Sequence, residues 1–260
     1  MKKISTLGNS PQGLQHYLQN IPAGDRNWES FRNYVDYKNT DGEYAYKELM
    51  LALTRKQHNL CAYCEIELKD TDRQIEHFHP KSDMKNGVEW AFLPSNLLAA
   101  CKGGDNPNEK DPRRTLEPIK ENRSCGASHG NQVLQNDQHP ANLPAMPSIF
   151  LVYRHGEITV NHEAYSKNAE FQKIAQSTIV SLNLNCRRLK NARSGLFERL
   201  LKEFNQRTQE QTDAEAMSEM ALASLLPDDS GKLPPFFTTR RSFLVEFAEE
   251  LLQHHPEVWI

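Results

Sequence analysis

The sequence predicts an α+β protein in which helical segments flank a middle region of different texture. Apolar residues recur at helical spacing near both ends of the chain. Between them lies a stretch rich in Gly, Asn, Asp and Pro that shows little periodicity. We therefore divide the 260 residues into an N-terminal helical segment (1–56), a middle region (57–135) with a long polar insert (102–124), and a C-terminal region (136–260).

Helices and one hairpin are predicted on either side of the middle region. Two apolar stripes predict the N-terminal helices: Leu14, Tyr17, Leu18 and Ile21, then Tyr46, Leu49, Met50 and Leu53. We expect both stripes to face the core and to take no direct part in chemistry. The apolar runs 148–153 and 158–160 flank a polar tetrapeptide, which predicts a β-hairpin. Helical spacing predicts four more helices, over 171–182, 189–204, 216–226 and 243–252.

Composition sets limits on compartment and partners. Apolar content of 38% and charged content of 25% are typical of soluble globular proteins. A net charge of −3 excludes a basic surface over the whole molecule, so any contact with nucleic acid must use a local patch. No stretch has the length of a membrane span, and the first residues do not resemble a signal peptide. We expect a cytoplasmic protein with no membrane partner, whose five cysteines stay reduced.

Four of the cysteines indicate a structural zinc site. Cys61 and Cys64 form a C-x2-C pair, and Cys101 and Cys125 supply two more thiolates for tetrahedral coordination. The alternative is that Cys101 is only buried and that no zinc binds. Cys186, outside this region, is interpreted as a small apolar filler.

Two other metal motifs are excluded by spacing. Cys61-x2-Cys64-x12-His77 matches the first part of a two-Cys, two-His finger, but the next histidine, His79, is followed at once by helix-breaking Pro80. The elements of a zinc-dependent nucleotide deaminase are also missing.

The middle region also contains the side chains needed to hydrolyse a phosphodiester with one metal ion. His77 suits the general base, because imidazole titrates near neutral pH. Glu76 precedes it in an extended segment and can bind a hard cation such as Mg²⁺ or Mn²⁺ from the opposite face. Asn96, at the expected start of a helix at Asn96-Leu97-Leu98, can fix the imidazole or orient the loop. His129 is the candidate second ligand.

Several further residues keep two interpretations. His79 is either an additional ligand or a packing neighbour. An isolated Asn before two leucines is more often a helix cap. Lys81, Arg187 and Arg188 are candidates for contacts with DNA phosphates, although such basic runs are more often solvated helix faces.

At these residues the chain resembles the HNH endonucleases, or ββα-metal finger nucleases, and among them the HNH proteins of Septu-type and retron-associated anti-phage systems. The resemblance rests on motifs spread over most of the chain: Cys61-Ala62-Tyr63-Cys64-Glu65, Ile75-Glu76-His77-Phe78, Pro80-Lys81-Ser82, Trp90, Asn96-Leu97-Leu98-Ala99-Ala100-Cys101, Cys125-Gly126 and Leu182-Asn183-Leu184-Asn185 with Leu189 and Arg193. The chain departs from the family after its last cysteines, where Lys102-Gly103-Gly104 and Gly126-Ala127-Ser128 stand in place of the usual His or Asn.

The resemblance implies a small ββα-metal nuclease core between helical segments, with His77 as general base, Glu76 as metal ligand and Asn96 as the middle Asn. It also implies DNA as substrate and an ATPase as partner protein. The alternative is a catalytically inactive, zinc-stabilised module that only binds nucleic acid or a partner.

Overall fold

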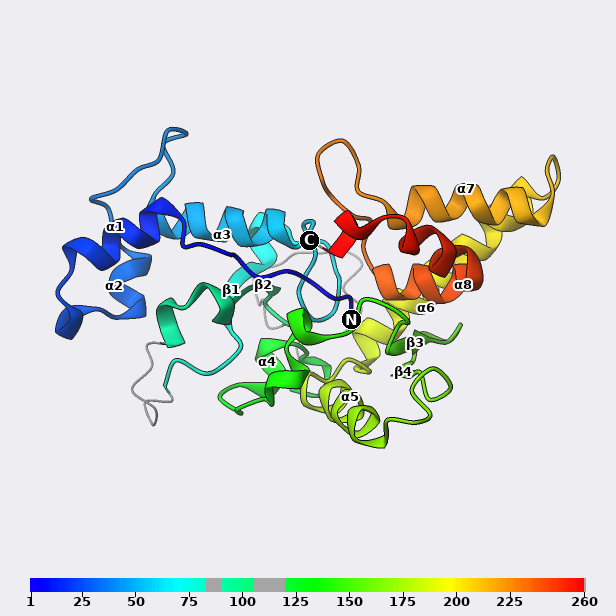
Figure 1. Ribbon diagram of the computed structural model, residues 1–260, viewed down its shortest axis with the longest axis horizontal. Helices are drawn as coiled ribbons and strands as arrows, with labels where there is room; N and C mark the ends of the chain where they lie inside the picture. The colour runs from blue at the N-terminus through cyan, green and yellow to red at the C-terminus, as the bar shows by residue number, and fades with distance from the viewer. Residues whose placement is uncertain (83–89, 105–119, 260) are drawn as a thin grey trace.

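The computed structural model describes residues 1–82, 90–104 and 120–259. It combines helices with two small antiparallel sheets, which confirms the α+β class predicted from the sequence. Most of the predicted polar insert (102–124) lies outside the described residues. Figure 1 shows the N-terminal helices at one end of the molecule, the later C-terminal helices at the other end, and the first sheet between them.

Three helices form the N-terminal end: α1 (Gln12–Asn20), α2 (Trp28–Arg32) and α3 (Ala45–Lys56). Asn27 caps α2, because its side chain accepts a hydrogen bond from the backbone N–H of Ser30 at 2.9 Å. Helix α1 packs closely on α3 at Gly13, where a Cβ would lie 2.6 Å from the Cα of Ala45. Most residues of the predicted apolar stripes are buried: Leu14 and Tyr17 of α1, and Leu49, Met50 and Leu53 of α3.

The first sheet pairs β1 (Arg73–His77) with β2 (Leu97–Cys101) in antiparallel register, with His77 opposite Leu97 and Arg73 opposite Cys101. A four-residue helix, α4 (Gly126–His129), follows. The prediction of a helix starting at Asn96-Leu97-Leu98 was wrong. The two leucines begin β2, and all five residues of that strand are buried. A short apolar run does not distinguish a buried strand from a buried helix, and pairing with β1 decides the outcome here.

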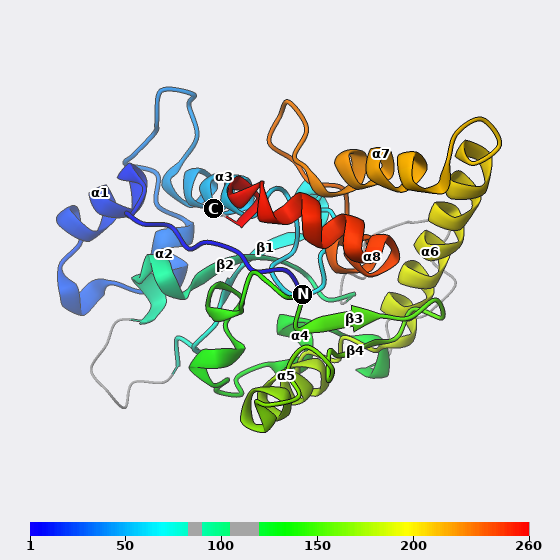
Figure 2. The same cartoon turned by 45° about the vertical axis from the view of Figure 1, so that its right-hand side comes forward.

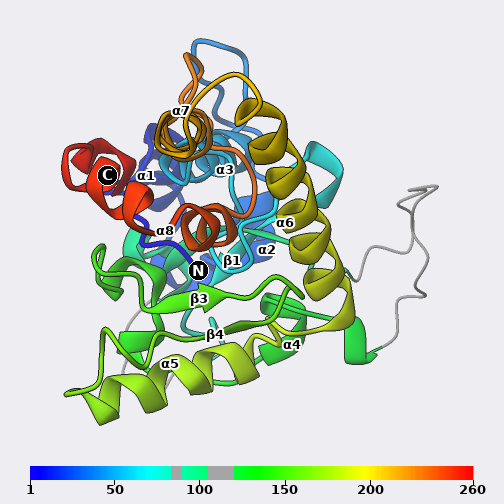
Figure 3. The ribbon, with the colours of Figure 1, turned by 90° about the vertical axis from the view of Figure 1, so that its right-hand side faces the viewer.

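The C-terminal region begins with the hairpin of β3 (Phe150–Val152) and β4 (Ile158–Val160), as predicted. It continues through α5 (Ala169–Ser181), α6 (Arg187–Arg207), α7 (Asp213–Leu225) and α8 (Phe237–Gln253), and α8 begins six residues before the predicted start. The hairpin lies between two helices, with β3 against α8 and β4 against α5 (Figure 3).

Long-range hydrogen bonds join the C-terminal region to the first sheet and the segments around it. The backbone N–H of Cys125 donates to the carbonyl of Leu182 at 2.9 Å, and the buried carboxylate of Glu65 accepts from the N–H of Thr238 at 2.8 Å. Both bonds start beside cysteines of the predicted metal site, which therefore lies where the middle and C-terminal regions meet. Among the described residues, no helix is long and apolar enough to cross a membrane.

Candidate functional site

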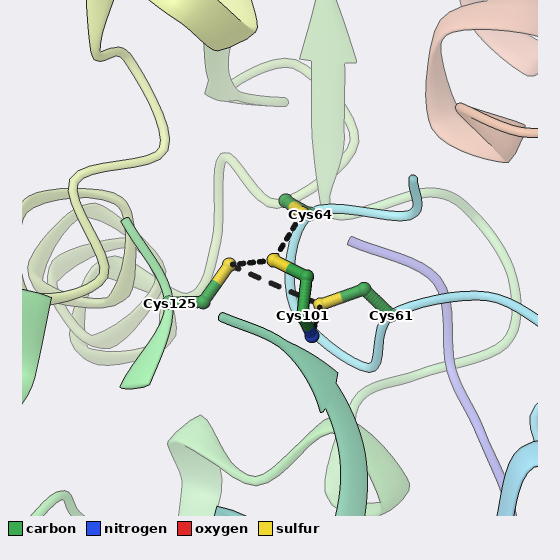
Figure 4. Close-up of side chains that lie close together, drawn as sticks. All are labelled: Cys61, Cys64, Cys101 and Cys125. Carbon is green, nitrogen blue, oxygen red and sulfur yellow. Dashed lines mark hydrogen bonds between the residues drawn. The ribbon is translucent and has the colours of Figure 1, made fainter. Parts of the chain in front are cut away.

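Cys61, Cys64, Cys101 and Cys125 form one buried cluster, called the cysteine cluster below (Figure 4). Their ligand atoms all lie within 4.8 Å of one another. The Sγ–Sγ distances are 3.6 Å for Cys64 and Cys101, 3.8 Å for Cys101 and Cys125, and 3.9 Å for Cys61 and Cys125. Four thiolates at about 2.3 Å from one zinc ion would be about 3.8 Å apart, so the cluster has the dimensions of a tetrahedral site.

Charge balance also favours a cation at this position. Burial, followed by hydrogen bonds with the other cysteines, raises the pKa of Cys125 well above its usual value. Four buried thiols cannot all ionise beside one another without a positive charge, whereas a bound cation favours the thiolate forms. The backbone N–H of Cys101 and that of Gly103 each donate to a cysteine Sγ at 3.3 Å, and such donors stabilise thiolates.

Arg188 belongs to the surroundings of the cysteine cluster. Its guanidinium donates to the hydroxyl of Ser124 at 2.7 Å, next to Cys125. Although burial alone would lower the pKa of Arg188, the neighbouring cysteine sulfurs raise it. The structure therefore places Arg188 toward the cysteines, whereas its neighbour Arg187 is exposed on α6.

Glu76 and His129 meet above the sheet. The Nε2 atom of His129 lies 3.1 Å from Oε1 of Glu76, although 53 residues separate them in the sequence. This approach requires Gly126, because a Cβ at that position would lie 2.3 Å from Oε2 of Glu76. Adjacent ligand atoms of an octahedral Mg²⁺ site are about 3 Å apart, so this carboxylate and this imidazole fit two positions around one such ion.

His77 follows Glu76 at the end of β1 and faces different neighbours. Its Nε2 lies 3.2 Å from the carbonyl oxygen of Ala91, and its ring meets that of Trp28 edge to face at 4.3 Å between centroids. A carbonyl only accepts hydrogen bonds, so Nε2 carries the proton and Nδ1 remains the basic nitrogen. Burial, and secondarily the charge of Lys81, lowers the pKa of His77 to about 4. The imidazole is therefore neutral at pH 7.

Asn96 orients the loop that follows β1. Its Oδ1 accepts from the backbone N–H of His79 at 2.7 Å, and its Nδ2 donates to the carbonyls of His79 and Trp90 at 3.0 and 2.8 Å. Of the two roles predicted for Asn96, these bonds correspond to orienting the loop and not to fixing the imidazole of His77. The ring of His79 stacks on that of Trp90 at 4.3 Å, so the structure places His79 as a packing neighbour of the loop.

Two of the catalytic candidates, Glu76 and His77, line one pocket of about 420 Å³, and His129 lies behind it in contact with Glu76. Glu76, His77, Lys81 and Gly126 are among its lining residues. Lys102, from the end of β2, also lines it and was not predicted from the sequence. The pocket thus places a neutral imidazole, a carboxylate and two ammonium groups around one open space, an arrangement suited to an anionic substrate.

Three contributing residues were missed from the sequence. Gly126 belongs to the sequence motif, but its role depends on the position of Glu76. Trp28 has no sequence signal that connects it to the site, because it lies on α2, 49 residues before His77 in the chain. Lys102 had a usable signal, since it follows Cys101 directly, but its orientation depends on the end of β2.

The two strands and the short helix α4, with a carboxylate, two histidines and four cysteines around them, define a metal-site architecture. A comparison with models of known protein families finds no match. A curated protein of Escherichia coli, named "Retron Ec83 putative HNH endonuclease", is 30% identical to this chain, and the match covers 94% of this chain and 94% of the relative. The chain therefore belongs to the HNH endonuclease family.

Proposed function

We propose that this protein is a metal-dependent endonuclease that hydrolyses phosphodiester bonds of DNA. The observation that carries the proposal is the approach of His129 to Glu76 at 3.1 Å, beside a pocket that Glu76 and His77 both line. Membership of the HNH endonuclease family supports it.

Each residue has a separate part in the proposed reaction. Glu76 and His129 would hold one Mg²⁺ or Mn²⁺ ion, which when bound polarises the scissile phosphate and stabilises the leaving oxygen. His77 accepts a proton from the attacking water at Nδ1, while Nε2 stays fixed on the carbonyl of Ala91. A nearby phosphate raises the pKa of His77 from its low value, which makes the imidazole a stronger base once substrate is bound.

The cysteine cluster would hold a structural Zn²⁺ ion and not take part in the reaction. It joins the loop before β1, the end of β2 and the start of α4, so it fixes the separation between the two strands and the helix that carries His129. Asn96 would act as a positioning residue, because its three hydrogen bonds fix His79 and Trp90, and Trp90 precedes the Ala91 whose carbonyl accepts from His77.

The test is cleavage of supercoiled plasmid by the purified chain with added Mg²⁺ or Mn²⁺ and with neither. We expect nicking only with metal, and a loss of about 10²–10⁴-fold in His77→Ala. His155→Ala is the matched control, because His155 is exposed on the hairpin between β3 and β4. Folded protein that binds DNA but never cuts it would instead support a catalytically inactive binding module.

We further propose that the endonuclease is the effector of an anti-phage system and acts with an ATPase partner. The retron relative and the resemblance to Septu-type proteins support this setting. A net charge of −3 predicts weak, salt-sensitive affinity for DNA in the isolated chain. The isolated chain should cut poorly. When expressed with its neighbouring genes, it should co-purify with an ATPase encoded beside it. Robust cleavage by the isolated chain at physiological salt would contradict this dependence on a partner.

A further inference from the structure

A second hollow of about 560 Å³ adjoins the catalytic pocket. The two share four lining residues from the first sheet and its flanking loops: Gln74, Ile75, Lys81 and Lys102. The rest of the second hollow comes largely from α2 and α3, which lie beside the first sheet (Figure 2). The shared residues connect the two hollows. The second hollow is called the N-terminal groove below.

Positive charge dominates the N-terminal groove. Its lining contains five basic side chains and two acidic ones: Arg32, Lys47, Arg73, Lys81 and Lys102, against Glu29 and Asp70. Arg73 pairs with Asp70 at 2.7 Å, and Lys102 donates to a backbone carbonyl. Within the described part of the chain, Arg32, Lys47 and Lys81 form no ion pair. This concentration of cations contrasts with a net charge of −3 for the whole chain.

An aromatic wall connects the groove to the catalytic histidine. Trp28 lines the groove, and the same ring meets that of His77 edge to face. Tyr46 lies beside it, 6.1 Å from Trp28 between ring centroids, and Arg32 lies over the ring of Tyr46 at 5.9 Å. A polymer that fills the groove would therefore extend to His77, the proposed general base.

We propose that the N-terminal groove binds the DNA strand next to the bond that is cut. Arg32 of α2 and Lys47 of α3 contact successive phosphates, Lys81 spans both hollows, and Trp28 with Tyr46 gives an apolar surface for the sugar and base. The N-terminal helices thus serve as a substrate-binding element, beyond the core-packing part expected from the sequence. This assignment rests on the proposed nuclease function, because it places the bound strand relative to the proposed catalytic site.

The geometry favours a phosphodiester chain over a single small anion. The cations come from α2, α3, β1 and the loops after both strands, so the positive charge is distributed over five parts of the lining. Phosphate contacts from lysine and arginine fix the position of a nucleic acid without reading its sequence. The groove should therefore raise affinity and set the path of the strand, with little effect on sequence preference.

The test compares the double variant Arg32→Ala/Lys47→Ala with wild type and with Lys167→Ala/Lys173→Ala. The control removes the same charge from exposed lysines in and beside α5, and neither pair contacts the catalytic pocket. Fluorescence anisotropy with a labelled DNA duplex and no added divalent metal gives the affinity of each full-length chain. For the groove variant we expect DNA affinity to fall by roughly tenfold or more at 0.1 M salt. The slope of log affinity against log salt concentration should also become shallower by about one to two.

Plasmid cleavage adds a second readout. The groove variant should raise KM and leave kcat near the wild-type value, because Glu76, His77 and His129 are untouched. Equal affinity and equal KM in the groove variant and the lysine control would overturn the proposal. Loss of kcat at unchanged KM would also overturn it. If wild type binds DNA but does not cut it, the nuclease function fails, while the anisotropy comparison still decides whether the groove binds DNA.

Discussion

Replacing Gly126 by alanine should separate the catalytic site from the fold. The added methyl group would lie 2.3 Å from Oε2 of Glu76, whereas ordinary contacts begin near 3.4 Å. The carboxylate must therefore move by 3.4 − 2.3, or about 1.1 Å, and it can do so because it ends a flexible side chain. That movement breaks the 3.1 Å approach to His129.

The consequences for activity and stability differ in size. A misplacement of about 1 Å in a catalytic group can cost about 10²-fold in rate, so Gly126→Ala should cut plasmid about 100 times more slowly. The lost hydrogen bond should change the free energy of unfolding by only about 1 kcal/mol. The measurements are initial cleavage rates over a Mn²⁺ titration, thermal denaturation and zinc content. A weaker metal dependence should accompany the lower rate.

Gly195→Ala is the control substitution. Gly195 lies inside α6, and the nearest atom that a new Cβ would meet there is 3.7 Å away, so alanine fits and favours the helix. Its cleavage rate should equal that of wild type. Wild-type cleavage by Gly126→Ala, at the same Mn²⁺ concentration, would refute the assignment of Glu76 and His129 to one metal ion.

Two other predictions follow from burial. The pKa of His77 is about 4 in the folded chain and about 6.5 in the unfolded chain, so between these values only the unfolded chain binds the proton and stability falls as pH drops. Between pH 7 and pH 4.5 the free energy of unfolding of His77→Gln should fall by roughly 2–3 kcal/mol less than that of wild type, as measured by urea denaturation. An equal fall in the two proteins would contradict this origin. Cys64→Ser should release zinc and lower the melting temperature, because the site is coupled to folding. Metal analysis and calorimetry would check this, and metal-free wild type that melts normally would remove zinc from the account.

Local pattern was enough to predict most elements of this fold. Periodic apolar stripes predicted α1, α3, α5, α6 and α7, and the polar tetrapeptide between two apolar runs predicted the hairpin of β3 and β4. The pattern was insufficient at Leu97 to Cys101, where a run of apolar residues lacks a period that separates helix from strand. Only pairing with β1, whose residues lie 20 to 28 positions before their partners, makes this segment a strand.

The sequence predicts those parts of the candidate site whose chemistry depends on residue type. It does not predict the parts that depend on close contact between residues far apart in the chain. Glutamate, histidine and cysteine are identifiable from their ligand atoms, so Glu76, His129 and the cysteine cluster could be named before the structure placed them together. Gly126 contributes by lacking a side chain, and Trp28 contributes from another helix. Neither contribution has a local signal, because each is a distance between residues far apart in the chain.

Diffraction from Mn²⁺-soaked crystals, recorded at the manganese and zinc absorption edges, tests the central claim most directly. The account predicts a manganese peak in contact with Glu76 and His129 and beside His77, and a separate zinc peak within the cysteine cluster. Manganese bound elsewhere, with Glu76 and His129 remaining only hydrogen-bonded to each other, would contradict the account.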